Sequence, residues 1–109
     1  MSEYTVKITN ENFEDEVIHS EMPVMLDFWA EWCPSCKALM PTVDEVAEEY
    51  TGKIKIGKVD TDEATALSEQ FRIMSIPTLL FFKGGELLDM HIGTITKTAL
   101  KAQLDEMLK

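Results

Sequence analysis

The hydrophobic positions of the chain change their period several times, and each change predicts a new element. Apolar residues alternate with polar ones over residues 4–8, as in a half-buried strand. Phe13 and Val17 then follow one helical turn apart, which predicts a helix. Thr9 or Asn10 stands where the cap of that helix is expected.

Pro23 ends this first helix, and the run VMLDFW that follows it, Val24–Trp29, is apolar on both faces. A strand of this kind is typical of the centre of a sheet that helices cover on each side. One residue breaks the pattern, because Asp27 places a carboxyl group in the middle of the strand.

A longer helix is predicted to begin at Cys33 and to end before Gly52. Pro41 lies inside it, where the missing N–H group and the proline ring predict a kink. One face of the helix is an apolar stripe, and the opposite face is acidic and expected to meet water. The stripe consists of Leu39, Val43, Val46, Ala47 and Tyr50, and the acidic face consists of Asp44, Glu45, Glu48 and Glu49.

The second half of the chain continues the order of strand and helix, and then two strands follow one another directly. Residues 54–59 predict a strand, although its alternation slips at Gly57, and the segment after it predicts a helix with an acidic start. Two further strands meet at Gly84–Gly85, which predicts a hairpin, and a last helix is expected over Thr96–Leu108. This order of elements predicts an α/β fold, a mixed sheet with helices on both faces.

Length and composition narrow the class of protein. With 109 residues we expect one globular domain, 1–109, and a monomer. The 45% hydrophobic and 28% charged residues are typical of a soluble protein, and no apolar run reaches the ~20 residues of a membrane span. The first residues do not resemble an export signal, so a cytoplasmic location is predicted. The net charge of −10 disfavours nucleic acid as a partner, because phosphates would be repelled.

Both cysteines of the chain lie in the stretch FWAEWCPSCKALMP, where a strand runs into a helix. Cys33 falls at or near the helix cap and Cys36 three residues later on the same face, close enough for a disulfide. A bridge across so short a loop stabilises the fold by roughly 2 kcal/mol, less than a long-range bridge. The free N–H groups of the first turn stabilise Cys33 as a thiolate, the nucleophilic form, so the pattern indicates dithiol redox chemistry.

Other interpretations of the two cysteines stay open. A zinc site needs four ligands, and only His19 and His91, in separate elements, stand beside the thiols, so no metal site is predicted. The cysteines are also compatible with two inert thiols in the core. A further alternative is a non-redox binding or chaperone-like module in which the thiols are incidental.

The chain resembles the thioredoxin family over nearly its whole length. The family's landmarks appear in order and at the expected spacing as LDFWAEWC, the helix interrupted by Pro41, KVDTDE, SIPTLLFFKGGE and IGTITKTAL. The resemblance implies a thioredoxin fold, a five-stranded mixed β-sheet flanked by four α-helices, with a cis Ile76–Pro77 bond in a loop beside the active site. It also implies a protein disulfide oxidoreductase that reduces substrates by dithiol–disulfide exchange and needs neither metal nor organic cofactor.

By this resemblance Cys33 is the attacking thiol and Cys36 the buried resolving thiol. Asp27 is then expected to have a raised pKa, because burial disfavours the carboxylate, and to exchange a proton with Cys36 through water. A core aspartate satisfied by backbone donors or an ion pair is the alternative. Lys58, on the adjacent strand, matches the family's lysine near this carboxylate, whereas a lone lysine is more often solvated surface.

The resemblance further implies a flat apolar surface around the reactive sulfur, suited to extended substrate segments that bind through main-chain hydrogen bonds. Its residues are Trp32, Ile76, Pro77, Ile92 and Gly93. Trp29 is expected to pack beneath the site and Trp32 to be partly exposed beside it, although either is compatible with ordinary core. Met40 and Met74 border the region and are interpreted as flexible gap fillers.

The chain departs from the family between the cysteines, where Pro34 and Ser35 replace the usual Gly-Pro. Pro34 falls at the start of the helix, which tolerates proline, and Ser35 restores an N–H group. The Ser35 and Cys36 amides are then expected to donate to the Cys33 sulfur, which favours the reduced form and makes the couple a weaker reductant.

A proline after the first cysteine also resembles glutaredoxin, so a glutathione-linked oxidoreductase is the alternative function. The partners that the thioredoxin resemblance implies are disulfide-containing substrate proteins and a flavin-dependent thioredoxin reductase that recycles the oxidised form.

Overall fold

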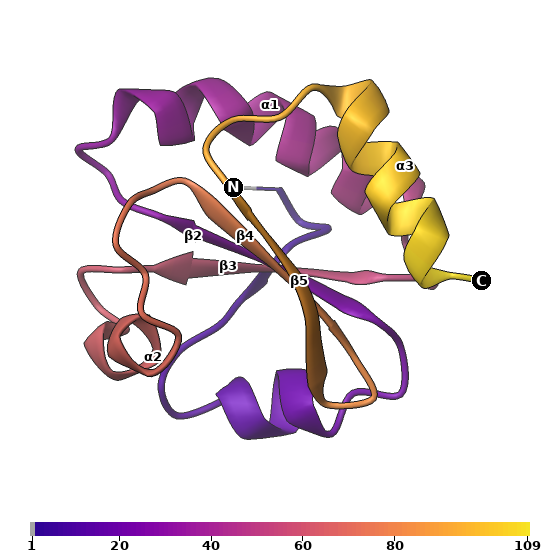
Figure 1. Ribbon diagram of the computed structural model, residues 1–109, viewed down its shortest axis with the longest axis horizontal. Helices are drawn as coiled ribbons and strands as arrows, with labels where there is room; N and C mark the ends of the chain where they lie inside the picture. The colour runs from indigo at the N-terminus through magenta and orange to yellow at the C-terminus, as the bar shows by residue number, and fades with distance from the viewer. Residues whose placement is uncertain (1) are drawn as a thin grey trace.

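The computed structural model describes residues 2–109, and its sheet joins strands that are far apart in the sequence (Figure 1). Their spatial order is β1-β3-β2-β4-β5. β1, β3 and β2 are parallel, β4 is antiparallel to β2, and β5 is antiparallel to β4, so the sheet is mixed, as expected. The strands are β1 (Val6–Lys7), β2 (Val24–Trp29), β3 (Lys55–Asp60), β4 (Thr78–Lys83) and β5 (Glu86–Ile92).

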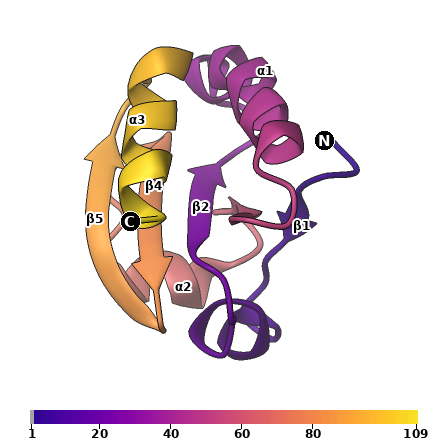
Figure 2. The ribbon, with the colours of Figure 1, turned by 90° about the vertical axis from the view of Figure 1, so that its right-hand side faces the viewer.

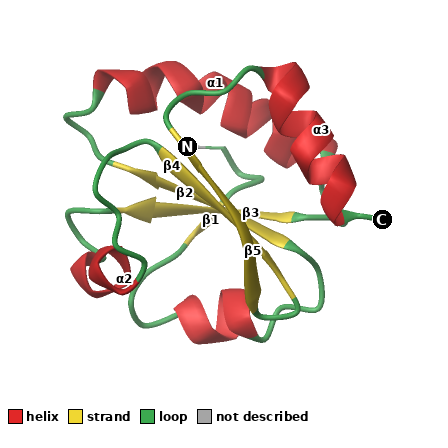
Figure 3. Cartoon of the chain, in the orientation of Figure 1, coloured by secondary structure: helices red, strands yellow, loops and turns green. Residues whose placement is uncertain are grey.

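Helices cover both faces of this sheet. Figure 2 shows α1 and α3 on one face and α2, with the helix near the N-terminus, on the other, and Figure 3 separates the same helices and strands by colour. In sequence order they are η1 (Glu14–Ile18), α1 (Pro34–Glu49), α2 (Thr65–Gln70) and α3 (Lys97–Met107). Together with the five strands, these four helices give the architecture that the resemblance implied, a five-stranded mixed sheet flanked by four helices.

The side chains of β2 alternate between two separate apolar clusters. Met25 belongs to the cluster beneath α1 and α3, while Leu26 belongs to the cluster that η1 and α2 cover. Every residue of β2 is buried, which confirms the central strand predicted from VMLDFW. Because side chains alternate along a strand, Asp27 lies on the same face as Met25, beneath α1.

Three glycines show how local geometry sets the sheet. Gly84 and Gly85, with φ +60° and +80°, make the two-residue turn between β4 and β5, which confirms the predicted hairpin. Gly57 explains why the alternation of β3 slips. A Cβ at this position would lie 2.7 Å from Ile8 Cγ1 and 2.8 Å from Leu26 Cδ2, so the neighbouring strands leave no room for a side chain.

The N-terminal elements differ most from the prediction. β1 covers only Val6–Lys7 instead of residues 4–8, and these two residues are the ones that pair with β3. η1 is a short π-helix of 5 residues. Its hydrogen bonds span five residues, so the 3.6-residue period that identifies an α-helix does not identify it. Thr9, not Asn10, caps the turn before it: Thr9 Oγ1 accepts from the Asn12 N–H at 3.2 Å, and Asn12 Oδ1 accepts from the Thr9 N–H at 2.7 Å.

The long helix α1 runs through Pro41 without ending there. It ends at Glu49, ahead of Gly52, whose φ is +80°. The kink expected at Pro41 stays a prediction.

Candidate active site

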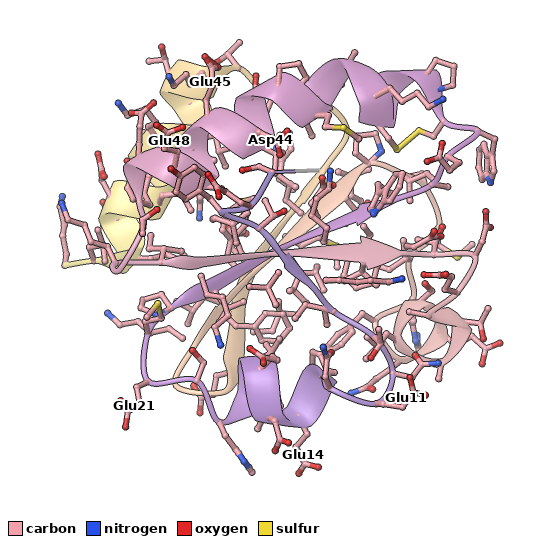
Figure 4. All side chains as sticks on the ribbon, turned by 180° about the vertical axis from the view of Figure 1, so that it is seen from behind. Glu11, Glu14, Glu21, Asp44, Glu45 and Glu48 are labelled. Atoms are coloured by element: carbon pink, nitrogen blue, oxygen red, sulfur yellow. A yellow bond between two sulfur atoms is a disulfide. The ribbon has the colours of Figure 1, made fainter. Side chains whose placement is uncertain are left out.

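Cys33 is the N-cap residue of α1, so its sulfur lies where the first helical turn exposes backbone donors. The Cys33 backbone is extended, with φ −96° and ψ 105°, and Cys33 Sγ accepts a hydrogen bond from the Cys36 N–H at 3.2 Å. Pro34 occupies the first helical position, where no N–H group is required. The Cys33–Cys36 disulfide, yellow in Figure 4, joins the cap to the first turn, and the two Cα atoms are 5.3 Å apart.

Ser35 contacts the sulfur through its side chain instead of its backbone. The Ser35 hydroxyl oxygen lies 3.4 Å from Cys33 Sγ. Within residues 2–109, the Ser35 amide is not among the donors to this sulfur, so the predicted second amide contact is wrong. The Cys33 sulfur, as the N-cap acceptor, receives its backbone hydrogen bond from Cys36, three residues later. The Ser35 hydroxyl contacts the sulfur where the Ser35 N–H was expected to donate.

Exposure does not distinguish the two cysteines, because Cys33 is 3% and Cys36 is 2% exposed. The capping geometry does distinguish them. The helix donates to the sulfur of Cys33, and a hydrogen bond to a charged acceptor contributes about 1.5 to 3 kcal/mol. The macrodipole of an exposed helix end contributes only about 0.3 to 1 kcal/mol. The Cys36 amide therefore stabilises a thiolate at Cys33 more than the dipole does.

The loop before β4 forms the opposite wall of the site. The Ile76–Pro77 peptide bond is cis, as the resemblance implied. The Ile76 carbonyl oxygen lies 3.8 Å from Cys33 Sγ, and the Pro77 carbonyl accepts from the Gly93 N–H at 2.8 Å, which ties the loop to the end of β5. Since a carbonyl oxygen only accepts, the Ile76 oxygen favours the protonated thiol and opposes the Cys36 amide.

Exposed apolar side chains surround the disulfide. Trp32 is 66% and Ile92 is 63% exposed, and Trp29 is buried in a cluster with the two cysteines, so the expected difference between the tryptophans is confirmed. A cavity of about 290 Å³ lies beside Trp32 and Ile76. Sequence reasoning missed one contact here: Trp32 Nε1 donates to Asp62 Oδ2 at 3.1 Å, from the loop after β3.

The two methionines near the site behave differently. Met40 is half-buried against the cysteine cluster, which agrees with its interpretation as a gap filler. Met74 is 92% exposed, so the same interpretation is wrong for it. It stands in the loop between α2 and β4, where no element of the described chain covers it.

Asp27 and Lys58 form a buried ion pair beneath the cysteines' helix. Both side chains are 1% exposed, and Lys58 Nζ lies 3.8 Å from Asp27 Oδ2. Burial raises the pKa of Asp27 to about 6, although the positive charge of Lys58 acts in the opposite direction. Lys58 Nζ also lies 5.1 Å from the centre of the Trp29 ring, within the range of a cation–π interaction.

This pair is not satisfied by the surrounding protein. Asp27 Oδ1 and Lys58 Nζ are buried and have no hydrogen-bond partner within residues 2–109. The alternative interpretation, an aspartate satisfied by backbone donors or an ion pair, is therefore confirmed in part: the ion pair with Lys58 is present, but no backbone group of the described residues donates to Asp27 Oδ1. A buried carboxylate and ammonium left in this way require water or proton exchange nearby.

Asp44 is a further charged group that sequence reasoning placed wrongly. It was assigned to the water-facing side of α1, but it is half-buried and its Oδ1 has no hydrogen-bond partner within the described chain. Figure 4 shows Asp44 below α1, toward the sheet, while Glu45 lies on the outer side. Its negative charge also raises the pKa of Asp27. The signal was present, because Asp44 stands four residues after Met40 and three before Ala47, on their side of the helix.

No helix in residues 2–109 is long and apolar enough to cross a membrane. In the same part of the chain, no three histidine, cysteine, aspartate or glutamate side chains come together in a way that could hold a metal ion.

Comparison with known proteins agrees with this geometry. The sequence model of the family described as Thioredoxin matches residues 4–106. The chain is 47% identical to Thioredoxin 1 of Nostoc over 102 residues, which covers 94% of this chain and 95% of the relative. It is 43% identical to the thioredoxin of Synechocystis over 95% of this chain and 97% of the relative. It is also 45% identical to the chloroplastic Thioredoxin M-type of spinach, over 93% of this chain and 56% of the relative.

Proposed function

Because this chain belongs to the thioredoxin family of thiol-disulfide oxidoreductases, we propose how its own residues divide the work of reducing a substrate disulfide. Cys33 is the attacking thiol and Cys36 the resolving thiol. The observation that carries this assignment is the 3.2 Å hydrogen bond from the Cys36 N–H to Cys33 Sγ, which stabilises negative charge on that sulfur.

In the first step the Cys33 thiolate attacks one sulfur of the substrate disulfide. A bond forms between Cys33 and that sulfur, and the other substrate sulfur leaves as a thiolate, which takes a proton from water. The Ser35 hydroxyl, 3.4 Å from Cys33 Sγ, donates to the thiolate before the attack. Pro34 and Ser35 thus tune the couple, and they favour its reduced form.

In the second step Cys36 gives up its proton and attacks Cys33, which releases the reduced substrate and forms the Cys33–Cys36 disulfide. Asp27, with a pKa of about 6, is mostly ionised at neutral pH and accepts this proton through water. Lys58 holds the carboxylate in place through its charge and limits the rise in pKa that burial causes.

The substrate segment binds to the surface formed by Trp32, Ile76, Pro77, Ile92 and Gly93. Support comes from the exposure of Trp32 and Ile92 and from the position of the Ile76 carbonyl, 3.8 Å from Cys33 Sγ. Trp29 and Pro41 have structural roles near the site. Disulfide-containing proteins are the substrates, and a flavin-dependent thioredoxin reductase restores the dithiol.

The remaining parts of the proposal concern the state of the protein. Residues 1–109 form a single domain, and the chain acts as a monomer in the cytoplasm. One relative is named as chloroplastic, so fractionation of the source cells tests the compartment. Light scattering of the purified chain tests the monomer.

The experiment that tests the assignment traps the mixed disulfide. A Cys36→Ser protein, mixed with a disulfide-bonded protein such as insulin, is expected to accumulate a covalent adduct at Cys33, while a Cys33→Ser protein is expected to form none. Peptide mapping identifies the linked cysteine. An adduct at Cys36 in the Cys33→Ser protein, formed at the same rate, would overturn the assignment.

The role of Asp27 has its own test. In rapid-mixing experiments with a preformed mixed disulfide, the release of substrate should become faster as the pH rises through about 6, because Asp27 must be ionised to accept the proton. Asp27→Asn should slow this release by about a hundredfold at neutral pH. A release rate unchanged in Asp27→Asn would remove Asp27 from the mechanism.

A glutathione-linked role is the second candidate, and the position of Pro34 at the start of α1 favours it. We expect a thioredoxin reductase to reduce the Cys33–Cys36 disulfide faster than glutathione does. The reverse order would favour the glutaredoxin-like function. A Cys33→Ser, Cys36→Ser protein that folds and keeps its biological activity would instead favour a non-redox binding module.

A further inference from the structure

The Asp27–Lys58 pair belongs to a row of side chains that continues to the edge of the sheet. Strand register places Lys58 beside Asp27 on β2 and beside Lys7 on β1. Neighbours in register lie on the same face of a sheet, so all three side chains face the side that α1 covers. β1 is the edge strand, and the row therefore leads from the buried carboxyl group to the surface (Figure 2).

Lys7 does not simply extend this row of charges. Like charges directly opposite each other across two strands destabilise a sheet. Lys7 Nζ instead pairs with Glu63 at 2.9 Å, and both side chains are more than half exposed. The Lys7–Glu63 ion pair thus closes the end of the row with a contact that water already reaches.

A cavity of about 200 Å³ lies beneath this ion pair. Its walls are formed by Lys7, Trp29, Lys58, Asp60 and Glu63. It has room for several water molecules, each of which occupies about 30 Å³ in the liquid. The Lys58 side chain, which forms part of the wall, is only 1% exposed, and Lys58 Nζ has no hydrogen-bond partner within residues 2–109. An ammonium group without a protein partner at the edge of a polar cavity is the kind of group that buried water solvates.

The charges around the cavity favour water over a bound ion. Lys58 and Lys7 contribute two positive charges, and Asp60 and Glu63 contribute two negative ones. Two charged groups act on Asp27 itself: Lys58, which belongs to β3, and Asp44, which belongs to α1. A cavity with balanced charge and one buried ammonium group has no net attraction for an anion or a cation, whereas water can both donate and accept along its wall.

We propose that this cavity is the route by which Asp27 exchanges its proton with bulk solvent, and that the Lys7–Glu63 ion pair is its outer gate. The proposal rests on the proposed role of Asp27. When Cys36 transfers its proton to Asp27, the substrate still covers the cysteine side of the site. A proton that leaves Asp27 before the substrate dissociates takes the other side: Asp27 gives it to water beside Lys58, and the cavity water passes it between Lys7 and Glu63 to the solvent.

The test compares two ways of removing the gate in the oxidised protein. Lys7→Leu with Glu63→Leu keeps the net charge and fills the mouth with apolar groups, while Lys7→Ser with Glu63→Ser keeps the net charge and leaves the mouth open to water. Lys109→Leu with Glu106→Leu removes another exposed ion pair, 3.3 Å long, and is the matched control far from the cavity.

The readout is the rate at which the Asp27 carboxyl group exchanges between its two protonation states. Carbon-13 relaxation of the Asp27 carboxyl carbon, measured by NMR near pH 6, gives this rate. We expect the leucine pair to slow it by about tenfold or more, the equivalent of one lost hydrogen-bonded step in the path. The serine pair and the control pair should leave the rate unchanged. Equal rates in the leucine and serine proteins would overturn the proposal.

A second measurement asks which side of the molecule the proton uses. A Cys36→Ala protein that carries a peptide on Cys33 as a mixed disulfide has its cysteine side covered. The Asp27 exchange rate should stay as fast in this adduct as in the free Cys36→Ala protein. Exchange that stops when the peptide is attached would show that the proton passes the cysteine side, and the proposal would be wrong.

These measurements are independent of turnover, because the exchange is observed at equilibrium and no substrate is reduced. A failure of the proposed role of Asp27 appears instead in the release rate of Asp27→Asn. An unchanged release rate in that variant, together with a slowed carboxyl exchange in the leucine pair, would keep the cavity as a proton route and remove its use in the reaction.

Discussion

The molecule buries two polar sites a short way apart, and it treats them in opposite ways. The Cys33 sulfur has a backbone donor, a side-chain hydroxyl and a carbonyl oxygen within 3.8 Å. Asp27 and Lys58 pair with each other at 3.8 Å, and each keeps an atom without a hydrogen-bond partner in the described chain. The sulfur site is built by local helix geometry, whereas the ion pair is built by the register of two strands. Changes at the ion pair should therefore affect stability in addition to the second step of the reaction, whereas changes at the sulfur should affect redox chemistry with little effect on stability.

The largest effect is expected for Lys58→Met, which leaves the Asp27 carboxylate buried without its counter-ion. Breaking a buried pair in this way costs about 4 kcal/mol. Urea unfolding at pH 8 should show this loss, and at pH 5 the loss should be smaller, because Asp27 is then protonated. The double variant Asp27→Asn, Lys58→Met is the control and should recover much of the stability at pH 8. A loss equal at both pH values would contradict the account.

The second prediction concerns the pH dependence of stability. The pKa of Asp27 is raised from 3.8 to about 6 in the folded chain, so the folded state binds the proton more tightly than the unfolded state. The contribution is therefore fully present below pH 4 and is lost as the pH rises to about 6, a change of about 3 kcal/mol. Asp27→Asn should remove this part of the slope in urea unfolding measured from pH 4 to pH 7. An identical slope in Asp27→Asn would be the contrary result.

Gly57→Ala tests the strand register that brings the ion pair together. A Cβ there would lie 2.7 Å from Ile8 Cγ1, so β1 or β2 must shift, and such overpacking costs about 2 kcal/mol. Thermal and urea unfolding measure the loss. Gly52→Ala, where φ is +80° but no atom lies within 4 Å of the new Cβ, is the matched control for strain without crowding. An unchanged free energy of unfolding in Gly57→Ala would show that crowding at Gly57 is unimportant.

The smallest effect in free energy is expected at the sulfur. Ser35→Ala removes the hydroxyl beside Cys33, which should make the Cys33 thiolate less stable and lower the reduction potential by about 30 mV, or about 1.4 kcal/mol. Equilibration with a glutathione buffer measures the potential, and urea unfolding should show almost no change.

A second variant separates the effect of the Ser35 hydroxyl on the reduction potential from the effect of the Ser35 backbone N–H. Pro34→Gly with Ser35→Pro restores the usual family sequence and should lower the potential as well. If Ser35→Ala has the full effect, the hydroxyl is responsible. A potential that falls in the proline variant but not in Ser35→Ala would reinstate the amide as the donor.

The elements that depend on local chemistry were predictable from the sequence. Gly84–Gly85 gave the hairpin because only glycine adopts both positive φ angles readily, and the apolar run of β2 gave the central strand. The cap at Cys33 followed from a strand that runs into a helix. The π-helix η1 and the short β1 were not predictable in the same way, because each depends on contacts with distant strands rather than on its own period.

The candidate site shows the same division. Cys33 and Cys36 were identified from their spacing, but the pairing of Asp27 with Lys58 came from the family resemblance, since no local pattern tells which residues of two strands are in register. Asp44 was predicted to face water because the apolar stripe of α1 suggested one buried face and one exposed face. Asp44 lies at the border of the two faces, and a side chain there is partly buried. The contact of the Ser35 hydroxyl was not predictable from the capping rule, because that rule concerns backbone N–H donors and leaves the side-chain rotamer open.

The capping bond at Cys33 has one more consequence. The Cys36 amide is held by the helix and donates to Cys33 Sγ while that sulfur is joined to Cys36, so a change of bonding partner at the sulfur requires no change in the position of this donor. Turnover therefore changes the bonding partner of a single atom and leaves the framework of the fold untouched. The exposed pair between the cysteines is free to vary in its chemistry at little cost to folding, which makes residues 34 and 35 a natural place for evolution to adjust driving force.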